Sequence, residues 1–248
     1  MAHAGRQDML SSGFIRTDAT MSAPICHPCP NDKGQPVFIA TPSSPCEPAA
    51  WDDPASIATA VPGGCVPAAL NGIAFAAVGL ADLPPPADID EPPYVPPAGL
   101  RAAAGAVVVE DDGRVWLVAP TNGFGGYDAT FPKGRVDPGA GLQATAVREV
   151  FEESGLAVEI VAFLADVRRT QTYTRYYLAR RTGGSPAMMG WETQAVHLVP
   201  AAALTEVAAH ANDTAIIAAL GQRLAVSPDG VMASAPAKRT AASGRSTA

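Results

Sequence analysis

The stretch FPKGRVDPGAGLQATAVREVFEESGL, residues 131–156, decides how the rest of this chain can fold. Its second half predicts a helix from about Gly141 to Ser154, ending at Gly155, because glycine suits the left-handed position that follows a helix. At 3.6 residues per turn, three glutamates of this helix fall within an arc of about 100°, and apolar residues occupy the opposite side. The three glutamates are Glu149, Glu152 and Glu153.

The position of these glutamates is unfavourable for an isolated helix. They lie in its last two turns, where negative charge opposes the helix dipole, and Glu149 and Glu153 form a like-charge pair, each effect costing roughly a few tenths of a kcal/mol. A divalent cation would offset this cost, whereas the alternative is a solvated charged face. The loop before the helix favours the cation, because Gly134, Pro138 and Gly139 let the backbone bend closely around a ligand.

The spacing of these residues resembles the Nudix box, which reads Gly, five residues, Glu, seven residues, Arg-Glu, apolar, any, Glu-Glu, any, Gly, apolar. The matching positions are Gly134, Arg148, Glu149, Val150, Glu152, Glu153, Gly155 and Leu156. One position departs from the pattern, since Ala140 stands where the family has its first Glu. The role of that acid is therefore lost or is taken by another group, such as Asp137.

The resemblance covers about half of the chain and implies an α/β fold of the Nudix type, an α/β/α sandwich with a mixed sheet. The pattern after Gly99 agrees with this expectation. Residues 106–110 and 115–119 flank Asp112-Gly113, a strong signal for a β-hairpin. After the helix, residues 157–171, 173–181 and 191–200 are rich in strand formers, and residues 201–224 are mostly helical in character.

The residues before Gly99 differ in composition, because they hold most of the chain's 24 prolines. Such density prevents long helices and central strands, so a Pro-rich, loop-rich N-terminal region precedes the α/β domain. The boundary at Gly99 predicts that the Nudix domain folds without the residues before it. We predict a disordered start at 1–21, a loop-rich region at 22–82, a proline-rich linker at 83–98, the Nudix domain at 99–226 and a disordered tail at 227–248.

The charge distribution argues against several classes of partner. The formal net charge is −7 and is concentrated before residue 99, so we expect no nucleic acid polymer to bind. The first 22 residues carry charges and no apolar run, which predicts a cytoplasmic location without a secretory signal. The longest uncharged run, residues 66–81, is too short to cross a bilayer, so we expect no membrane partner. The sequence leaves the oligomeric state open.

Four cysteines lie in the N-terminal region: Cys26, Cys29, Cys46 and Cys65. The motif Cys26-His27-Pro28-Cys29 is compatible with half of a zinc site or with a redox pair. A structural zinc site has a second close pair of ligands, and Cys46 and Cys65 are far apart in the sequence. We therefore favour free thiols.

The resemblance also implies an activity, namely hydrolysis of a diphosphate linkage in a small phosphoanhydride substrate with Mg²⁺, or with Mn²⁺ in its place. The metal ligands implied are the backbone carbonyl of Lys133, the three glutamates of the helix and an additional acid, Glu192. The three glutamates are also the candidate catalytic residues, together with Arg148. We expect Arg148 to orient the carboxylates, most naturally through Glu152 one turn further on.

Candidate substrate-binding residues are Lys133, Arg135 and Arg175. Five arginines crowd one strand pair, and we expect most of them to be exposed charges on an edge strand, with Arg175 contacting phosphate. The five are Arg168, Arg169, Arg175, Arg180 and Arg181. This region is similar to the Nudix branch that acts on diadenosine polyphosphates and diphosphoinositol polyphosphates, while nucleoside diphosphate sugars and ADP-ribose stay open. The alternative function is a ligand-sensing or partner-binding module, in which Ala140 marks relaxed catalytic constraint.

Overall fold

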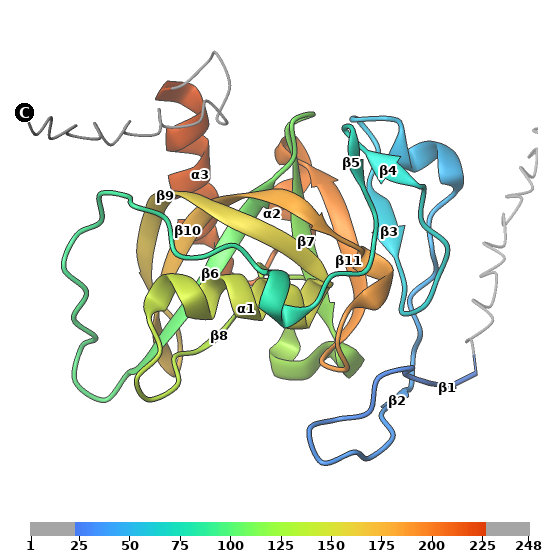
Figure 1. Ribbon diagram of the computed structural model, residues 1–248, viewed down its shortest axis with the longest axis horizontal. Coiled ribbons are helices and arrows are strands. Elements are labelled where there is room, and N and C mark those ends of the chain that lie inside the picture. Colours follow the sequence, from blue (N-terminus) through green and yellow to red (C-terminus); the bar gives the residue numbers. More distant parts are fainter. Residues whose placement is uncertain (1–22, 227–248) are drawn as a thin grey trace, which may run out of the picture.

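A computed structural model describes residues 23–226 of the chain, so the segments predicted to be disordered, 1–21 and 227–248, lie outside the described residues. The centre of the molecule is a seven-stranded mixed sheet (Figure 1). Its order is β3 (Ala58–Ala60), β11 (Thr193–Pro200), β7 (Arg114–Pro120), β6 (Arg101–Val109), β10 (Thr172–Gly184) and β9 (Leu156–Arg168), and β8 (Lys133–Arg135) pairs with β6. Only β6 and β10 are parallel neighbours.

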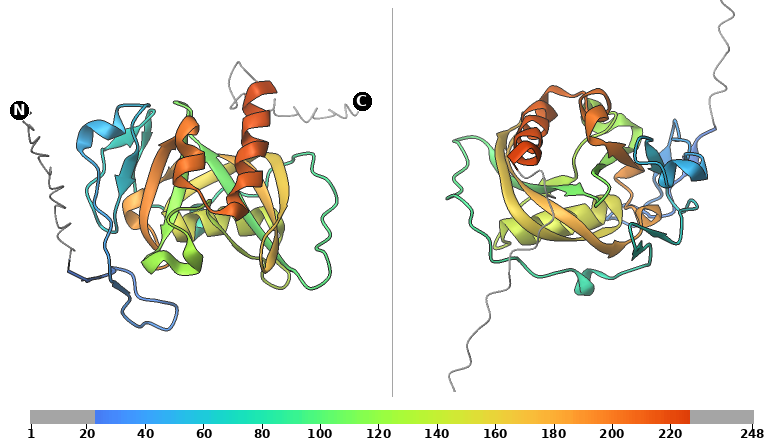
Figure 2. Two further views of the ribbon diagram at one scale, coloured as in Figure 1. Left: turned by 180° about the vertical axis from the view of Figure 1, so that it is seen from behind. Right: turned by 90° about the horizontal axis from the view of Figure 1, so that it is seen from above.

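Helices cover both faces of this sheet, as the view from above in Figure 2 shows. Helix α1 (Leu142–Ser154) packs on one face, and α2 (Leu204–Val207) and α3 (Thr214–Val226) pack on the other. The alternation of side chains along β6 builds both cores, because Ala106 and Val108 face α1 whereas Val107 and Val109 face α3. The expected α/β/α sandwich with a mixed sheet is confirmed.

The hairpin predicted around Asp112-Gly113 is confirmed. Strands β6 and β7 pair at Val109 and Val115, and Gly113 has a φ of 83° in the turn between them. The Asp112 side chain accepts a bond from the Arg114 backbone N–H at 3.0 Å. The turn therefore sets the register of two central strands through local bonds.

The N-terminal half adds a strand and side chains to this domain. Strand β3 pairs with β11 and extends the central sheet, and Trp51 is buried in the α1 core at a ring-centroid distance of 6.2 Å from Trp116. Two short hairpins are formed by β1 (Ile25–Cys26) with β2 (Phe38–Ile39) and by β4 (Ala69–Leu70) with β5 (Ile73–Ala74). The amino-acid composition changes at Gly99, but residues from before and after Gly99 pack in the same hydrophobic core.

Residues 83–98, predicted as a linker, run along the outside of the domain (Figures 1 and 2). The Ala87 backbone N–H donates to Gln143 Oε1 at 2.8 Å, and Glu91 accepts a bond from Gln143 Nε2 at 2.9 Å. The Tyr94 ring stacks on Tyr173 at 5.5 Å. This segment therefore has fixed contacts with α1 and β10.

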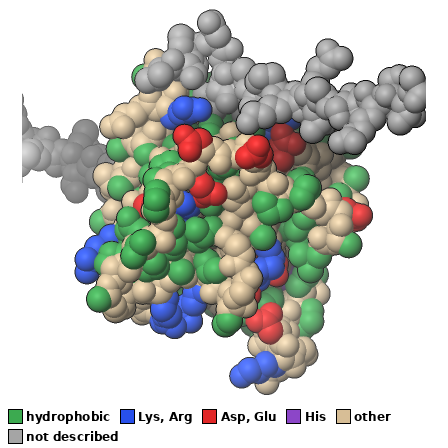
Figure 3. All heavy atoms as spheres, turned by 60° about the vertical axis from the view of Figure 1, so that its left-hand side comes forward, with side chains coloured by type: hydrophobic (Ala, Val, Ile, Leu, Met, Phe, Trp, Pro, Cys, Tyr) green, Lys and Arg blue, Asp and Glu red, His purple; other side chains and the backbone are tan. Residues whose placement is uncertain are grey.

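Among residues 23–226, no helix combines the length and the hydropathy needed to cross a membrane. On the face drawn in Figure 3, Lys and Arg side chains are scattered among apolar and acidic ones. This visible face carries no broad basic area.

Candidate active site

Helix α1 carries the acids predicted from the sequence and ends where expected. Gly155 follows it with a φ of 72°, and its backbone N–H donates to the Phe151 carbonyl at 2.8 Å. A Cβ at Gly155 would lie 2.3 Å from the Ser185 carbonyl oxygen, so glycine is also required by the close approach of the chain after β10. Val147 and Val150 are buried in the core, which turns the acidic side of the helix away from it.

Arg148 connects three carboxylates at the surface of α1. Its Nη1 lies 2.9 Å from Glu152 Oε2, and its Nη2 lies 2.9 Å from Glu149 Oε1 and 3.2 Å from Asp137 Oδ2. The expected contact with Glu152 is present. Asp137, named as a substitute for the acid missing at Ala140, thus supplies a carboxylate to the arginine of the box.

Glu149 and Glu153 are the two acids of α1 that are removed most from water. Glu153 accepts a bond from the Lys133 backbone N–H at 2.8 Å. Burial, with the charges of Glu192 and of a neighbouring acid of α1 as smaller causes, raises the pKa of Glu149 and of Glu153 to about 7. Lys133 and, for Glu149, Arg148 oppose this rise. The site therefore holds carboxylates whose charge is only partly balanced by protein groups.

A cleft of about 570 Å³ opens beside the acidic side of α1. Its lining residues come from α1, from the loop before β11 and from the N-terminal region, and they are Asp32, Arg148, Glu149, Phe151, Glu152, Met188, Gly190, Trp191 and Glu192. The loop is attached to the helix because the Gly190 N–H donates to the Glu152 carbonyl at 2.9 Å. Burial raises the pKa of Glu192, and the charge of Asp32 raises it further.

Comparison with known proteins places this region in a family, because a family model described as NUDIX domain matches residues 99–220. These residues form a Nudix domain. The RNA pyrophosphohydrolase of Novosphingobium aromaticivorans is 35% identical over 78 residues, which are 31% of this chain and 48% of that protein. The RNA pyrophosphohydrolase of Pseudoalteromonas atlantica is 34% identical over 95 residues, 37% of this chain and 51% of that protein.

The chain spans about half the length of the curated relatives it matches. Among solved structures, an Ap4A hydrolase from C. elegans is similar with a TM-score of 0.43 and 20% sequence identity. That similarity covers 50% of this chain and 98% of the C. elegans chain.

The donor groups of the Nudix domain suit a hard divalent cation, because they are carboxylate oxygens and a backbone carbonyl. The Glu149 carboxylate lies in a cradle over Gly134, where a Cβ would come within 1.9 Å of Glu149 Oε2. In the part of the chain that the structure describes, no three His, Cys, Asp or Glu side chains already converge as a metal site. Arg148 and the Lys133 N–H hold the glutamates instead. The residues fit a cation by chemistry, and their present contacts would compete with it.

The structure brings together most of the predicted site residues. Glu149, Glu152, Glu192 and Arg148 line one cleft, and Glu153 lies beside Lys133 behind it. The charge of Lys133 lowers the pKa of Glu149, Glu153 and Glu192, which places its side chain within electrostatic reach of all three. Arg135 is exposed on β8 and does not line the cleft.

The environment of Arg175 argues against its role as a phosphate ligand, and the contact with substrate stays a prediction. Its side chain is 1% exposed, and its Nε and Nη2 bond the Asp166 carboxylate at 2.8 and 2.7 Å. Its Nη1 bonds Glu91 at 2.8 Å, and the Tyr94 ring lies 4.9 Å from the guanidinium. Two carboxylates already neutralise this cation, so a phosphate would have to compete with both of them.

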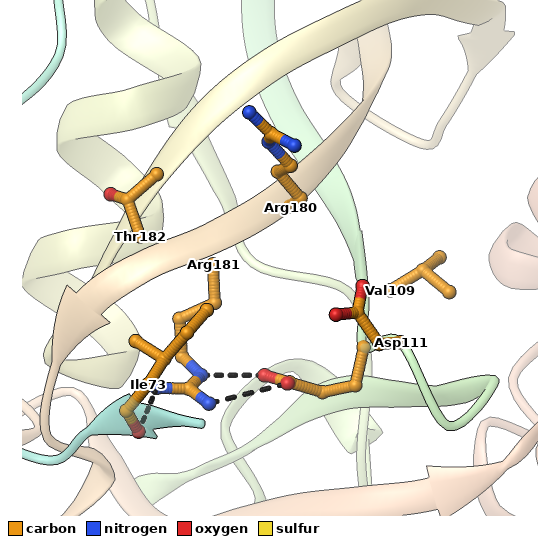
Figure 4. Close-up of a pocket in the computed structure, with 7 residues that line it drawn as sticks. Ile73, Val109, Asp111, Arg180, Arg181 and Thr182 are labelled. Atoms are coloured by element: carbon orange, nitrogen blue, oxygen red, sulfur yellow. Dashed lines mark hydrogen bonds and ion pairs between the residues drawn. The ribbon is translucent and has the colours of Figure 1, made fainter. Parts of the chain in front are cut away.

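Two further arginines are buried where exposed edge-strand charges were expected. Arg169 is 5% exposed and pairs with Asp213 at 2.9 Å. Arg181 is 2% exposed, lies against Glu110 and donates to the Ile73 carbonyl (Figure 4). The cavity of about 280 Å³ beside Arg181 is therefore lined by a cation that is already neutralised. The expectation failed because each long side chain reaches an acid on another element.

The motif Cys26-His27-Pro28-Cys29 has a structural role that the sequence did not show. All four cysteines are free, as favoured. His27 is 3% exposed, accepts a bond from the Cys29 N–H at 2.9 Å and contacts the Thr193 carbonyl at 3.1 Å. Both ring nitrogens are engaged, so the motif attaches the N-terminal region beside the cleft.

Sequence reasoning missed Asp32 and Trp191 as residues of the cleft. Asp32 lies in a loop without periodicity, and its only signal was the acidic excess before residue 99. Trp191 directly precedes the predicted acid Glu192, and that adjacency was available as a signal.

Proposed function

We propose that this protein hydrolyses a diphosphate linkage in a nucleoside-linked substrate and that it uses Mg²⁺ for this reaction. The observation that carries the proposal is the cluster of partly compensated glutamates on α1 beside an open cleft, with Arg148 bridging Glu149 and Glu152. Acids in such a position cost stability unless a cation or a reaction uses them. The relatives named RNA pyrophosphohydrolase agree with a phosphoanhydride substrate.

The glutamates of α1, the Lys133 carbonyl and Glu192 would hold the cation. When bound, it supplies positive charge to phosphate oxygens and lowers the pKa of a bound water. Arg148 keeps Glu149 and Glu152 in place through its two bonds. As the water oxygen bonds to phosphorus and the bridging oxygen departs with the leaving phosphate, Glu149 or Glu192 takes the water's proton, because both line the cleft.

The ion pairs of the arginines change the substrate that we expect from the sequence. The resemblance favours diadenosine polyphosphates and diphosphoinositol polyphosphates alike, and a highly anionic substrate would use the arginine group. Three of the five arginines pair with Asp166, Asp213 and Glu110. We therefore propose a nucleoside-linked substrate of the diadenosine polyphosphate or ADP-ribose type. The absence of a nucleic acid polymer among the partners stays a prediction, and a triphosphorylated RNA belongs in the test.

The second candidate is a Nudix module that binds a ligand with little turnover, which Ala140 favours. Purified full-length protein with Mg²⁺ should be incubated with diadenosine tetraphosphate, ADP-ribose, a nucleoside diphosphate sugar, a diphosphoinositol polyphosphate and a short RNA with a 5′-triphosphate. Turnover that is lost in Glu149→Gln and kept in Glu206→Gln, an exposed acid on α2, supports the enzyme. Tight binding of one compound without turnover would favour the module.

A further inference from the structure

One residue that lines the cleft, Asp32, comes from outside the Nudix domain. Asp32 lies at the tip of a turn in which the Asn31 side chain accepts bonds from the backbone N–H groups of Lys33 and Gln35, both at 3.0 Å. Asp32 Oδ1 accepts a bond from Trp191 Nε1 at 3.1 Å. Among the described residues, no donor bonds Asp32 Oδ2. The turn thus presents one carboxylate oxygen to Trp191 and leaves the other available.

The segment before Asp32 contacts the loop that carries Trp191 at two points, one before Trp191 and one after it. His27 contacts the Thr193 carbonyl at 3.1 Å, and Cys29 Sγ lies 3.8 Å from the Met189 carbonyl. The Gly190 N–H bonds the Glu152 carbonyl, so the same loop is also fixed to α1. Because of these contacts, Asp32 has a defined position relative to Glu149 and Glu192.

The charges that line the cleft are unequal. Four of the lining residues are acids and one is a base, Arg148, which is already paired with three carboxylates. The apolar lining residues are Phe151, Met188 and Trp191, and Trp191 lies directly beside Asp32. A flat ring can pack on Trp191, whereas a phosphate placed near Asp32 would meet its negative charge, and Arg148 is the one basic residue, among those described, that lines the cleft.

We propose that Asp32 is a specificity-determining residue of this cleft, with Trp191 as its partner. The Trp191 indole, held by Asp32 Oδ1, packs on the nucleoside part of the substrate, and Asp32 Oδ2 accepts a bond from a hydroxyl or amino group there. The charge of Asp32 disfavours a longer phosphate chain. The cleft therefore selects a substrate with two phosphates and a sugar or base beyond them, a conclusion that rests on the proposed function.

The test compares kcat/KM for ADP-ribose and for diadenosine tetraphosphate at fixed Mg²⁺ and ionic strength. Asp32→Asn keeps one acceptor for Trp191 Nε1, removes the charge and replaces the Oδ2 acceptor by an amide donor. It should raise the ratio of tetraphosphate to ADP-ribose about fivefold, mainly through KM, because two charges about 8 Å apart repel by that much at an effective dielectric of about 40, between the values near a protein surface and in bulk water. Asp52→Asn removes the same charge from an exposed position outside the cleft and should leave the ratio unchanged.

The same ratio is measured as dissociation constants in the Glu149→Gln background, so that the result does not depend on turnover. An unchanged ratio in Asp32→Asn, by both measurements, overturns the role of Asp32 and leaves the proposed hydrolase intact. A wild-type protein that binds both compounds without hydrolysing either overturns the proposed function, and the binding ratio still decides the role of Asp32.

Discussion

The acids at the cleft and the arginines that contact the N-terminal region differ in how completely their charges are paired. Glu149 and Glu153 are crowded with other acids, and their pKa values are raised to about 7. Arg114, Arg175 and Arg181 are more deeply buried, yet each is paired with a carboxylate and each contacts residues that precede Gly99. Full pairing is what stability requires of a buried charge, while incomplete pairing leaves a group free for chemistry.

The largest effect should come from removing residues 1–98. This truncation deletes β3 and Trp51 from the core and the carbonyl partners of Arg114 and Arg181. Arg114 and Arg181 keep Asp112 and Glu110, but the α1 core loses Trp51 and β11 loses its partner strand, so the exposed apolar surface should cause aggregation or loss of a cooperative unfolding transition. Circular dichroism of residues 99–226 during urea unfolding checks this. A cooperative transition like that of the full chain would show that the Nudix domain folds alone, as the boundary at Gly99 predicts.

The acid side of the comparison is tested by Glu149→Gln. It should lower kcat about 10²- to 10⁴-fold, the usual contribution of a positioned acid or base. The free energy of unfolding should stay the same or rise slightly, because one like charge leaves the end of α1. Steady-state kinetics and urea unfolding of the same preparation give both values. Wild-type activity in this variant would remove Glu149 from the catalytic assignment.

The variant Glu110→Gln tests the pairing of the buried arginines, because Glu110 is the partner of Arg181. Glu110 is 4% exposed, lies against Arg181 and accepts a bond from Trp116 Nε1 at 2.7 Å. Glu110→Gln leaves a buried cation without its counter-charge, which should cost about 3 to 5 kcal/mol of unfolding free energy.

The matched control for Glu110→Gln is Glu159→Gln, whose partner Arg180 is 36% exposed. An exposed pair contributes only about 0 to 1 kcal/mol. Equal losses in the two variants, measured by urea unfolding, would show that burial does not set the value of these pairs.

The smallest expected effect is a pH-dependent loss of stability at the pairing of β3 with β11. Thr59 Oγ1 lies 2.9 Å from His197 Nδ1, and burial lowers the pKa of His197 from 6.5 to about 4. Since the folded pKa lies below the unfolded one, the neutral ring stabilises the fold fully above pH 6.5, and this contribution is lost as the pH falls toward 4. Because the ring is partly exposed, the free energy of unfolding should fall by only about 1 to 2 kcal/mol.

Thermal unfolding of wild type and His197→Gln at pH 7 and pH 5 isolates this contribution. The wild type should lose more stability than the variant over that interval, because only the wild type must keep the ring neutral. Parallel losses in both proteins would assign the acid sensitivity to other groups.

Local features were predictable from the sequence, and contacts between distant segments were not. The end of α1 at Gly155, the hairpin at Gly113 and the bond between Arg148 and Glu152 each depend on neighbours within a few residues. The burial of Arg175 depends on Glu91, which is 84 residues away, and on Asp166 across the strand pair. A pattern of alternating residues gives the face of a strand, and it does not say which acid from another element will meet that face.

In the candidate site too, local features were predictable from the sequence and contacts between distant segments were not. The glutamates of α1 and Arg148 were predicted because the box fixes their spacing. Asp32 was missed because its approach to Trp191 crosses 159 residues of sequence and depends on the anchoring of His27 beside Thr193.

The pairing of β3 with β11 has a consequence for the order in which the chain is made. Thr59 and His197 are 138 residues apart, so a ribosome adding about 5 to 20 residues per second has made β3 roughly 7 to 28 s before its partner strand exists. During that interval Trp51 and the strand at residues 58–60 have no sheet to join, and the many prolines around them disfavour premature strand pairing. Strand β3 is therefore translated early and cannot pair in the central sheet until β11 has been made.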